Sequence, residues 1–150
     1  MTLEFSFEIA VTIGPPLEVG DTPHGKRRII PITGGRFEGP NIAGVVLPGG
    51  ADWQVVRPDG LAEIEARYTL QTHDGTLIYI TNVGMRHGPP EVMRRLAAGE
   101  PVKPEEYYFR TVPRFELKTG TAYDWLTRSL FVATGSRFPD RVLIGVWRAV

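Results

Sequence analysis

The most chemically informative stretch of the chain is the corner Gly-Gly-Ala-Asp-Trp at residues 49–53. It places the carboxylate of Asp52 beside the large ring of Trp53, where a strand is expected to begin. A partly apolar wall raises the pKa of a carboxyl group and prepares it to take up or release a proton. We therefore consider Asp52 a candidate catalytic base and Trp53 a ligand contact. The alternative is structural: Asp52 would cap the amides of the turn, and Trp53 would plug the end of the fold.

Arginines that stand in or beside expected strands, next to aromatic residues, form a second group of candidates. They are Arg67, Arg86, Arg110, Arg114 and Arg137. An arginine that points inward can hold a ligand carboxylate or an enolate through two parallel hydrogen bonds. We expect Arg86 to stabilise negative charge as it develops during a reaction, and Arg67 and Arg110 to bind the ligand.

The orientation of Arg67 is left open by the residue pattern. In the alternating stretch 61–72, parity places Tyr68 rather than Arg67 on the apolar face. Arg67 points inward only if the interior is polar and the apolar face packs outside. The alternative for all of these arginines is an exterior ladder of ion pairs with Glu63, Glu65 or Glu116.

A buried arginine is costly without an anionic partner, so the unliganded site should hold Asp52, Glu116 or a bound anion near the arginines. Glu116 lies on the expected strand 107–118, which should close the opposite wall of the site with Tyr108 and Arg110. Aromatic rings such as that of Tyr108 can wall a pocket for a flat ligand, but strand cores use the same residues for packing.

Tyr79 and Asn82 are the other candidates for ligand binding. A phenol and an amide at this spacing can both aim donors at one carbonyl group if the strand that carries them bulges. Gly84 is the expected site of that bulge, since glycine inside a strand often marks one. The extra residue would also move Arg86 to the same side of the sheet as Tyr79.

Turns at regular intervals separate these segments. The chain contains 17 Gly and 13 Pro, spread along its length rather than gathered in a linker. Between the turns, apolar and polar residues alternate with period two, which predicts about nine strands and one helix, over residues 90–98. The strands are expected at residues 3–13, 26–37, 42–47, 51–57, 61–72, 76–86, 107–118, 130–138 and 141–150.

Tight turns between consecutive strands predict an antiparallel sheet. Because closure removes the exposed edges of so many strands, we predict an all-β fold, a closed antiparallel β-barrel with one short helix, rather than an open sandwich. A chain of 150 residues suits a single domain over residues 1–150.

Composition excludes several classes of function. Lys and Arg total 17, as do Asp and Glu, so the formal net charge of zero gives no attraction to nucleic acid or to an anionic membrane. No apolar run is long enough for a membrane helix, and the acidic N-terminus is unlike a signal peptide, so we expect a cytoplasmic protein. Cysteine is absent and the histidines His24, His73 and His87 are scattered, so we expect no metal site and no cofactor.

The segments GVVLPGGADWQ, EARYTLQTHDG, IYITNVGMR and YYFRTVPRFEL, with YDWL near the end, resemble the family known as domain of unknown function 3237. The resemblance covers nearly the whole chain. It implies one small antiparallel β-barrel, similar to the calycin and allene oxide cyclase barrels. Barrels of that kind bind small apolar or polyphenolic molecules, or cyclise and isomerise them, but a fold alone does not determine a function.

Three functions fit these observations. The first is a cofactor-free isomerase, cyclase or hydrolase that acts on a small, partly apolar carbonyl or aromatic compound. The second is a carrier of a small hydrophobic ligand without turnover, and the third is a structural dimeric barrel without a site. A titratable group facing a cavity distinguishes the enzyme from the other two. Strand faces that are apolar on both sides also lead us to expect a homodimer.

Overall fold

A computed structural model describes all 150 residues of the chain. Its strands are β1 (Leu3–Ile13), β2 (Leu17–Thr22), β3 (Gly25–Glu38), β4 (Ala43–Val46), β5 (Gly50–Val56), β6 (Ala62–Thr72), β7 (Leu77–His87), β8 (Tyr108–Leu117), β9 (Phe131–Arg137) and β10 (Arg141–Ala149). One α-helix, α1 (Pro90–Ala97), and two 3-10 helices, η1 (Pro104–Glu106) and η2 (Asp124–Thr127), complete the fold. None of the helices is long and apolar enough to cross a lipid bilayer.

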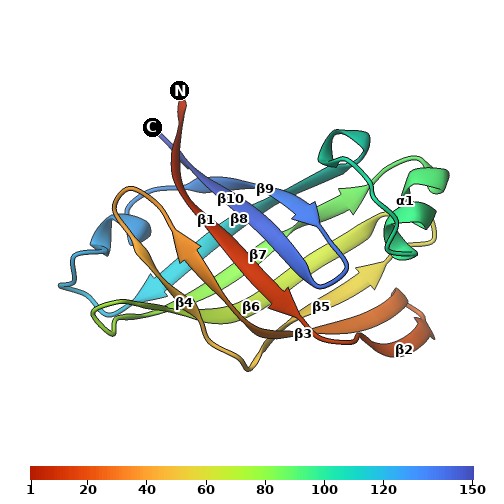
Figure 1. Cartoon of the computed structure of the whole chain (residues 1–150), viewed down its shortest axis with the longest axis horizontal. Helices are drawn as coiled ribbons and strands as arrows, with labels where there is room; N and C mark the ends of the chain where they lie inside the picture. Colours follow the sequence, from red (N-terminus) through yellow and green to blue (C-terminus); the bar gives the residue numbers. More distant parts are fainter.

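The strands form a closed antiparallel barrel, which confirms the predicted fold (Figure 1). Strands β6 to β10 pair consecutively, and β1 closes the ring by pairing with both β10 and β3. Two places around the wall are each shared by two strands: β1 and β2 pair with successive parts of β3, and β4 and β5 both lie between β3 and β6. The ten strands therefore make an 8-strand barrel.

Two local predictions need correction. Residues 17–22, expected in a loop, form β2, because Gly14-Pro15-Pro16 bends the chain without ending its pairing with β3. Residues 124–127, for which no helix was expected, form the 3-10 helix η2. The Asp124 carboxylate accepts hydrogen bonds from the backbone N–H groups of Gly120 and Thr121, at 3.0 and 3.1 Å, which stabilises this helical turn.

One half of the barrel is filled with apolar side chains. A cluster of 18 buried residues fills it and extends toward the other half, and it includes four phenylalanines whose rings contact one another in the order Phe37, Phe7, Phe115 and Phe131. Leu126 of η2 covers this end and is only 2% exposed. Each buried phenylalanine contributes about 1.5–3 kcal/mol to folding. This half supplies the stability that allows the other half to be built differently.

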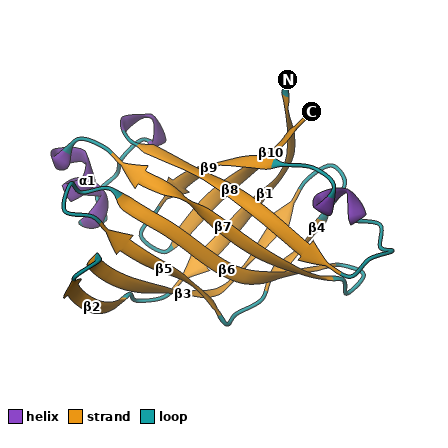
Figure 2. Ribbon diagram, turned by 180° about the vertical axis from the view of Figure 1, so that it is seen from behind, coloured by secondary structure: helices purple, strands orange, loops and turns teal.

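The opposite end of the barrel is covered by α1 and the segment that follows it. Figures 1 and 2 show α1 and β2 at the same end of the molecule, away from η2. Val92 of α1 packs with Tyr107 and Phe109 against Ala62 and Ile64 of β6. The amphipathic helix predicted from the sequence thus lies across one end of the barrel, where it closes the hollow half from outside.

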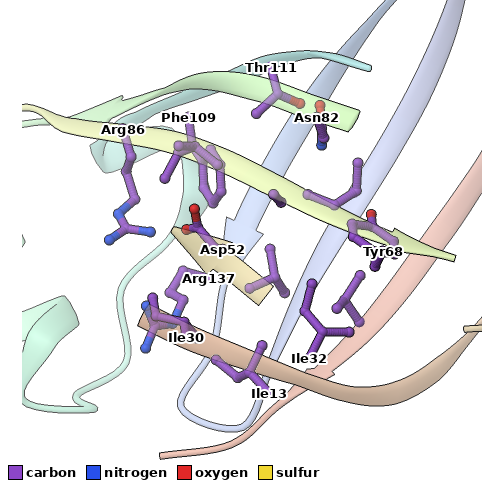
Figure 3. A pocket seen from close by; sticks show the side chains of 15 residues that line it. Ile13, Ile30, Ile32, Asp52, Tyr68, Asn82, Arg86, Phe109, Thr111 and Arg137 are labelled. Carbon is purple, nitrogen blue, oxygen red and sulfur yellow. The ribbon is translucent and has the colours of Figure 1, made fainter. Parts of the chain in front are cut away.

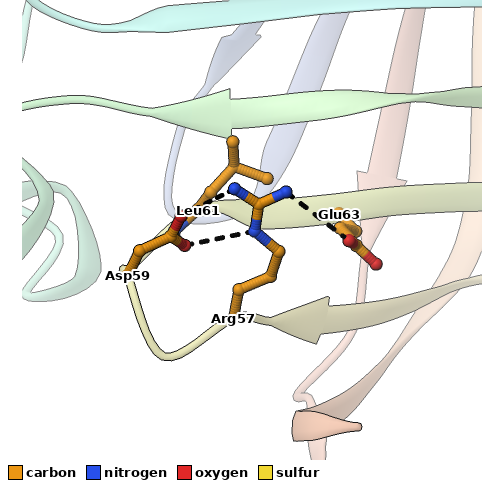
Figure 4. Close-up of polar contacts among 4 residues, drawn as sticks. All are labelled: Arg57, Asp59, Leu61 and Glu63. Carbon is orange, nitrogen blue, oxygen red and sulfur yellow. Dashed lines mark hydrogen bonds and ion pairs between the residues drawn. The ribbon is translucent and has the colours of Figure 1, made fainter.

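The turn between β5 and β6 is fixed by Asp59 (Figure 4). Its carboxylate pairs with the Arg57 guanidinium at 2.6 Å and accepts the backbone N–H of Leu61 at 3.2 Å. The hydrogen bond from Arg57 and the one from Leu61 lower the pKa of Asp59 to about 2. The turn holds β5 in register with β6, and β5 carries Asp52.

Candidate functional site

A small cavity of about 50 Å³ occupies the hollow half of the barrel (Figure 3). Ten of its 15 lining residues are hydrophobic, among them Ile30, Ile32, Ile64, Phe109 and Ile144. The remaining five carry polar groups: Asp52, Asn82, Arg86, Thr111 and Arg137. An apolar space with a few converging polar groups is the usual form of a small-molecule site.

Asp52 is fixed at one end of this cavity by two hydrogen bonds. Its Oδ1 accepts the backbone N–H of Glu65 on the neighbouring strand at 3.0 Å, and its Oδ2 accepts Nε2 of Gln54 at 3.1 Å. Burial nevertheless raises the pKa of Asp52, outweighing these two hydrogen bonds and the attraction of Arg86 and Arg137. The carboxyl group is thus better able to hold a proton than an ordinary aspartate.

Arg86 lies near Asp52 and is almost completely enclosed. It is 6% exposed, its Nε has no hydrogen-bond partner, and it forms no ion pair with a carboxylate. Burial, with the like charge of Arg137, lowers the pKa of Arg86 to about 10, so the guanidinium is still charged at neutral pH. Its one close partner is the ring of Phe109, 5.4 Å from Cζ to the ring centroid.

Arg137 brings a second guanidinium to the same end. Burial and the like charge of Arg28 lower its pKa, and Asp52 partly offsets them. Its backbone N–H donates to the Tyr107 hydroxyl at 2.9 Å, which fixes the end of β9 over the cavity. Two positive groups and one carboxyl group thus meet in an apolar enclosure, an arrangement that favours binding of an anionic oxygen.

A chain of side chains behind Asp52 holds it in position. Gln54 is fully buried, and its Oε1 accepts Nη1 of Arg28 at 3.1 Å. Arg28 in turn pairs with Glu18 of β2 at 3.0 Å. The orientation of Asp52 is therefore linked through Gln54 and Arg28 to the outer strand β2.

Three neutral polar groups lie further inside the cavity. The Tyr68 hydroxyl, Oδ1 of Asn82 and the Thr111 hydroxyl are all buried and have no hydrogen-bond partner in the protein. Their residues are 4%, 2% and 2% exposed, respectively. Burial raises the pKa of Tyr68, so its phenol is neutral and can donate.

No group of three or more His, Cys, Asp or Glu side chains gathers as a metal site would.

The structure brings together three of the expected site residues, Asp52, Asn82 and Arg86. The predicted bulge at Gly84 is wrong, because β7 pairs with β6 and β8 without a break in register. Simple alternation therefore places Asn82 and Arg86 inside the barrel and Tyr79 outside, where it is 40% exposed. Tyr79 and Arg86 do not share a face.

Arg67 also points away from the cavity. It lies on the outer face of β6 and pairs with Glu65 at 2.6 Å, as the exterior alternative required. Tyr68, its neighbour, points inward, because the apolar face of β6 faces the barrel interior. Arg67 and Tyr79, both expected to bind the ligand, thus do not share a wall of the site with Asn82 and Arg86.

The opposite wall is also built differently from the expected one. Tyr108, Arg110 and Glu116 all lie on the outer face of β8, because the inward positions of that strand are the odd-numbered ones. Tyr108 stacks on His87 with ring centroids 4.9 Å apart, and Arg110 donates to the Phe109 carbonyl at 2.9 Å. Trp53 is 37% exposed and does not line the cavity. Of the two anionic partners expected near the buried arginines, Asp52 is present and Glu116 is not.

Sequence reasoning missed the role of two cavity residues, Thr111 and Arg137. Thr111 shares the inward face of β8 with Phe109, and the alternation of buried and exposed residues along that strand predicts this orientation. Arg137 was only one of several strand arginines, and nothing local distinguishes it. Its position over the cavity depends on the closure of the barrel through β9 and β10.

A comparison with known families matches residues 1–149 to the Protein of unknown function (DUF3237). The chain belongs to this family. A UPF0311 protein from Rhodopseudomonas palustris is 50% identical over 148 residues, which is 97% of this chain and 95% of the relative. A UPF0311 protein from Clostridium acetobutylicum is 43% identical over 149 residues, or 99% and 94% of the two chains.

Solved structures share the same fold. The crystal structure of a conserved protein of unknown function from R. palustris superposes with a TM-score of 0.94 at 46% identity, over 99% of this chain and 97% of that one. A β-barrel-like protein from Acinetobacter baumannii gives a TM-score of 0.83 at 39% identity, over 99% and 96% of the two chains.

The chain also resembles a fungal protein whose name gives an activity. A hydroalkoxylation enzyme from Penicillium herquei is 34% identical over 79 residues, 53% of this chain and 52% of the relative. A solved enzyme from the same fungus superposes with a TM-score of 0.72 at 23% identity, over 98% of this chain and 92% of that one, which shows a common fold.

Proposed function

We propose that this DUF3237 member is a cofactor-free enzyme that moves a proton on a small, partly apolar carbonyl or aromatic compound. The observation that carries the proposal is that a carboxyl group of raised pKa and a buried guanidinium without an ion-pair partner lie at the same end of an apolar cavity. Asp52 exchanges the proton. Arg86, with Arg137, stabilises negative charge on an oxygen of the substrate.

Cyclisation is the reaction class that this site supports best. Hydroalkoxylation, the activity named for the fungal relative, adds the O–H bond of an alcohol or phenol across a carbon–carbon double bond, so that one carbon gains hydrogen and the other gains oxygen. In such a step protonated Asp52 gives its proton to one alkene carbon, and the hydroxyl oxygen forms a bond to the other. The hydroxyl proton then passes to the Asp52 carboxylate, which restores the starting state. Atoms and electrons balance, so the step needs no oxidant or reductant.

Isomerisation of a carbonyl compound uses the same groups. Asp52 as a carboxylate removes a proton next to the carbonyl, and Arg86 holds the resulting enolate oxygen. Both reactions leave the mass of the substrate unchanged, whereas a hydrolase adds the mass of water and a carrier leaves the ligand intact. We place the enzyme in the cytoplasm, in keeping with the absence of cysteine.

Mass spectrometry of small molecules exposed to the purified protein distinguishes these outcomes. The protein is incubated with a bacterial metabolite extract, and bound and released compounds are compared with those in an extract incubated with Asp52→Asn. We expect a compound that the wild type consumes and a product of equal mass with a different retention time. The Asp52→Asn extract should keep the substrate.

Asp59→Asn is the matched control, because Asp59 lies in the exposed β5–β6 turn and does not line the cavity. It should convert the substrate as the wild type does. Retention of one compound without conversion, equally by the wild type and Asp52→Asn, would instead identify a carrier and refute the enzymatic proposal.

A further inference from the structure

The polar groups of the cavity lie at two separate ends. Figure 3 shows Asp52, Arg86 and Arg137 at one end and Tyr68, Asn82 and Thr111 at the other, with apolar side chains between them. The first end is charged and the second is neutral. We call the second end, formed by the side chains of Tyr68, Asn82 and Thr111, the inner end, because these residues adjoin the filled half of the barrel.

The two ends are far enough apart to hold two groups of one ligand. Arg86 and Asn82 lie four residues apart on the inward face of the same strand, β7. At a rise of about 3.3 Å per residue, their Cα atoms are separated by about 13 Å. Tyr68 lies still further from Arg86, since it stands opposite Ile80 in the β6–β7 ladder, two residues beyond Asn82.

The unpaired atoms of the inner end determine which group fits there. Oδ1 of Asn82 is only an acceptor, so a hydrogen-bond donor must satisfy it. The hydroxyls of Tyr68 and Thr111 can each donate or accept. A carboxylate would add a second unpaired acceptor and charge, and a ketone, which only accepts, would leave Oδ1 of Asn82 without a donor. A hydroxyl group, which donates once and accepts twice, fits all three.

We propose that the inner end is a binding subsite for a neutral hydroxyl group of the substrate, at a distance from the reacting oxygen. The substrate is therefore a molecule with two oxygen functions: an acidic or enolisable one held by Arg86, and an alcohol or phenol held by Asn82, Thr111 and Tyr68. This inference rests on the proposed function only in that both use the same cavity.

Entry of such a substrate requires movement at the charged end. A cavity of about 50 Å³ holds a few water molecules, whereas cavities that admit a benzene ring measure about 150 Å³. Arg137 lines both this cavity and an outer groove of about 560 Å³, to which Leu96, Val102 and Phe138 also contribute. An aromatic substrate reaches the inner end by displacing the Arg137 side chain and extending into the groove.

Stability measurements on the unliganded protein test the first part of the inference. A buried hydroxyl without a partner costs stability, so Tyr68→Phe and Thr111→Val should leave Tm unchanged or raise it by about 2–4 °C. Tyr79→Phe and Thr134→Val remove the same groups from the outer surface and should not change Tm. A fall in Tm of more than about 2 °C in both inner variants would show that their hydroxyls already have internal partners, and would overturn the proposal.

Binding of matched carboxylates tests the second part. 4-Hydroxycinnamate, cinnamate and 4-methoxycinnamate share an anionic end and a ring and differ only in the group at the far end. We expect the wild type to bind the hydroxy compound about tenfold more tightly than cinnamate, and the methoxy compound least tightly. This preference should disappear in Tyr68→Phe and Thr111→Val and persist in Tyr79→Phe.

Two outcomes would refute the hydroxyl subsite. One is equal affinity of the wild type for the three probes, and the other is no binding of 4-hydroxycinnamate. Failure of the proposed function gives a different result: Asp52→Asn and the wild type would then convert metabolites alike, or neither would, while the hydroxyl preference of the inner end remained measurable.

Discussion

The carboxylate of Asp52 on β5 accepts the backbone N–H of Glu65 on β6 at 3.0 Å, so one side chain joins two strands of the barrel wall. Its other oxygen accepts Gln54, which is itself fixed by Arg28. The carboxyl group is therefore held in one orientation while burial raises its pKa. This combination of fixed geometry and readiness to hold a proton is what general acid–base catalysis requires.

Replacing Asp52 by Asn should remove catalysis without removing the fold. The amide oxygen of asparagine can still accept the Glu65 N–H, but the side chain cannot exchange a proton. We expect the turnover rate to fall at least about 100-fold, which is the lower range for loss of a general acid or base. The circular dichroism spectrum should match that of the wild type. Retention of full activity would exclude Asp52 from the chemistry.

The raised pKa of Asp52 also makes a prediction about stability. The native carboxyl group binds its proton more tightly than the unfolded chain does, so its contribution is fully present below the ordinary value of 3.8. That contribution is lost as pH rises through the higher pKa of the folded state. Urea unfolding at a series of pH values should therefore show the wild type losing free energy of unfolding relative to Asp52→Asn as pH increases. A difference that is constant with pH would mean that the pKa is not raised.

Gly84 tests how closely the inner end is packed. A Cβ at this position would clash with the backbone carbonyl oxygen of Arg110 and lie 2.5 Å from Cα and 2.6 Å from Cγ2 of Thr111, so Gly84→Ala must displace this part of β8. We expect a loss of about 1–3 kcal/mol in the free energy of unfolding, measured with urea. Gly14→Ala is the control, because its nearest neighbour would be Thr33 Cγ2 at 3.4 Å. Equal stability of the two variants would show that β7 and β8 can separate locally at little cost.

Most of the barrel could be predicted from the sequence, because period-two alternation records which face of each strand is buried. The stretch that became β6 shows this well: parity put Tyr68 and Arg67 on opposite faces, as they are in the structure. Parity did not tell which of the two faces lines the interior, and Arg67, expected to bind the ligand, lies outside. The prediction failed at Gly84, where a glycine inside a strand was interpreted as a bulge. It instead permits close approach of β8, a contact that the sequence of β7 alone does not contain.

The site was harder to predict than the wall. Asp52, Asn82 and Arg86 were found from residue type and local pattern. Arg137 and Thr111 were not, because their meeting with Asp52 depends on how far each strand is shifted along its neighbour around the closed barrel. That shift is set by many weak pairings between distant segments and leaves no local mark.

The outer face of β7 to β9 leads us to expect a homodimer. It exposes a row of apolar side chains, each 40–50% accessible: Tyr79, Val83, Met85, Val112 and Val132. Val83 and Val112 stand directly opposite each other in the β7–β8 ladder, and charges of both signs surround them, which suits contact with a second copy.

Sedimentation at micromolar concentration should give the mass of two subunits for the wild type and one for Val83→Lys. Leu17→Lys, which changes an exposed apolar residue of β2, should remain dimeric. A wild type that sediments as one subunit contradicts the expectation.

Arg86 should contribute to ligand binding at a cost to stability. It is buried, carries charge and has no anionic partner within pairing distance, so the unliganded fold must tolerate an uncompensated guanidinium. Arg86→Met keeps much of the length of the side chain and removes the charge. We expect it to raise the free energy of unfolding by about 1–3 kcal/mol and to weaken binding of cinnamate by about 2 kcal/mol or more.

Arg67→Met is the matched control: Arg67 is exposed and paired with Glu65 at 2.6 Å, so its loss should change stability by less than about 1 kcal/mol and leave cinnamate binding intact. If Arg86→Met is less stable than the wild type and binds cinnamate equally well, then Arg86 supports the barrel through its contact with Phe109 and does not bind the anion.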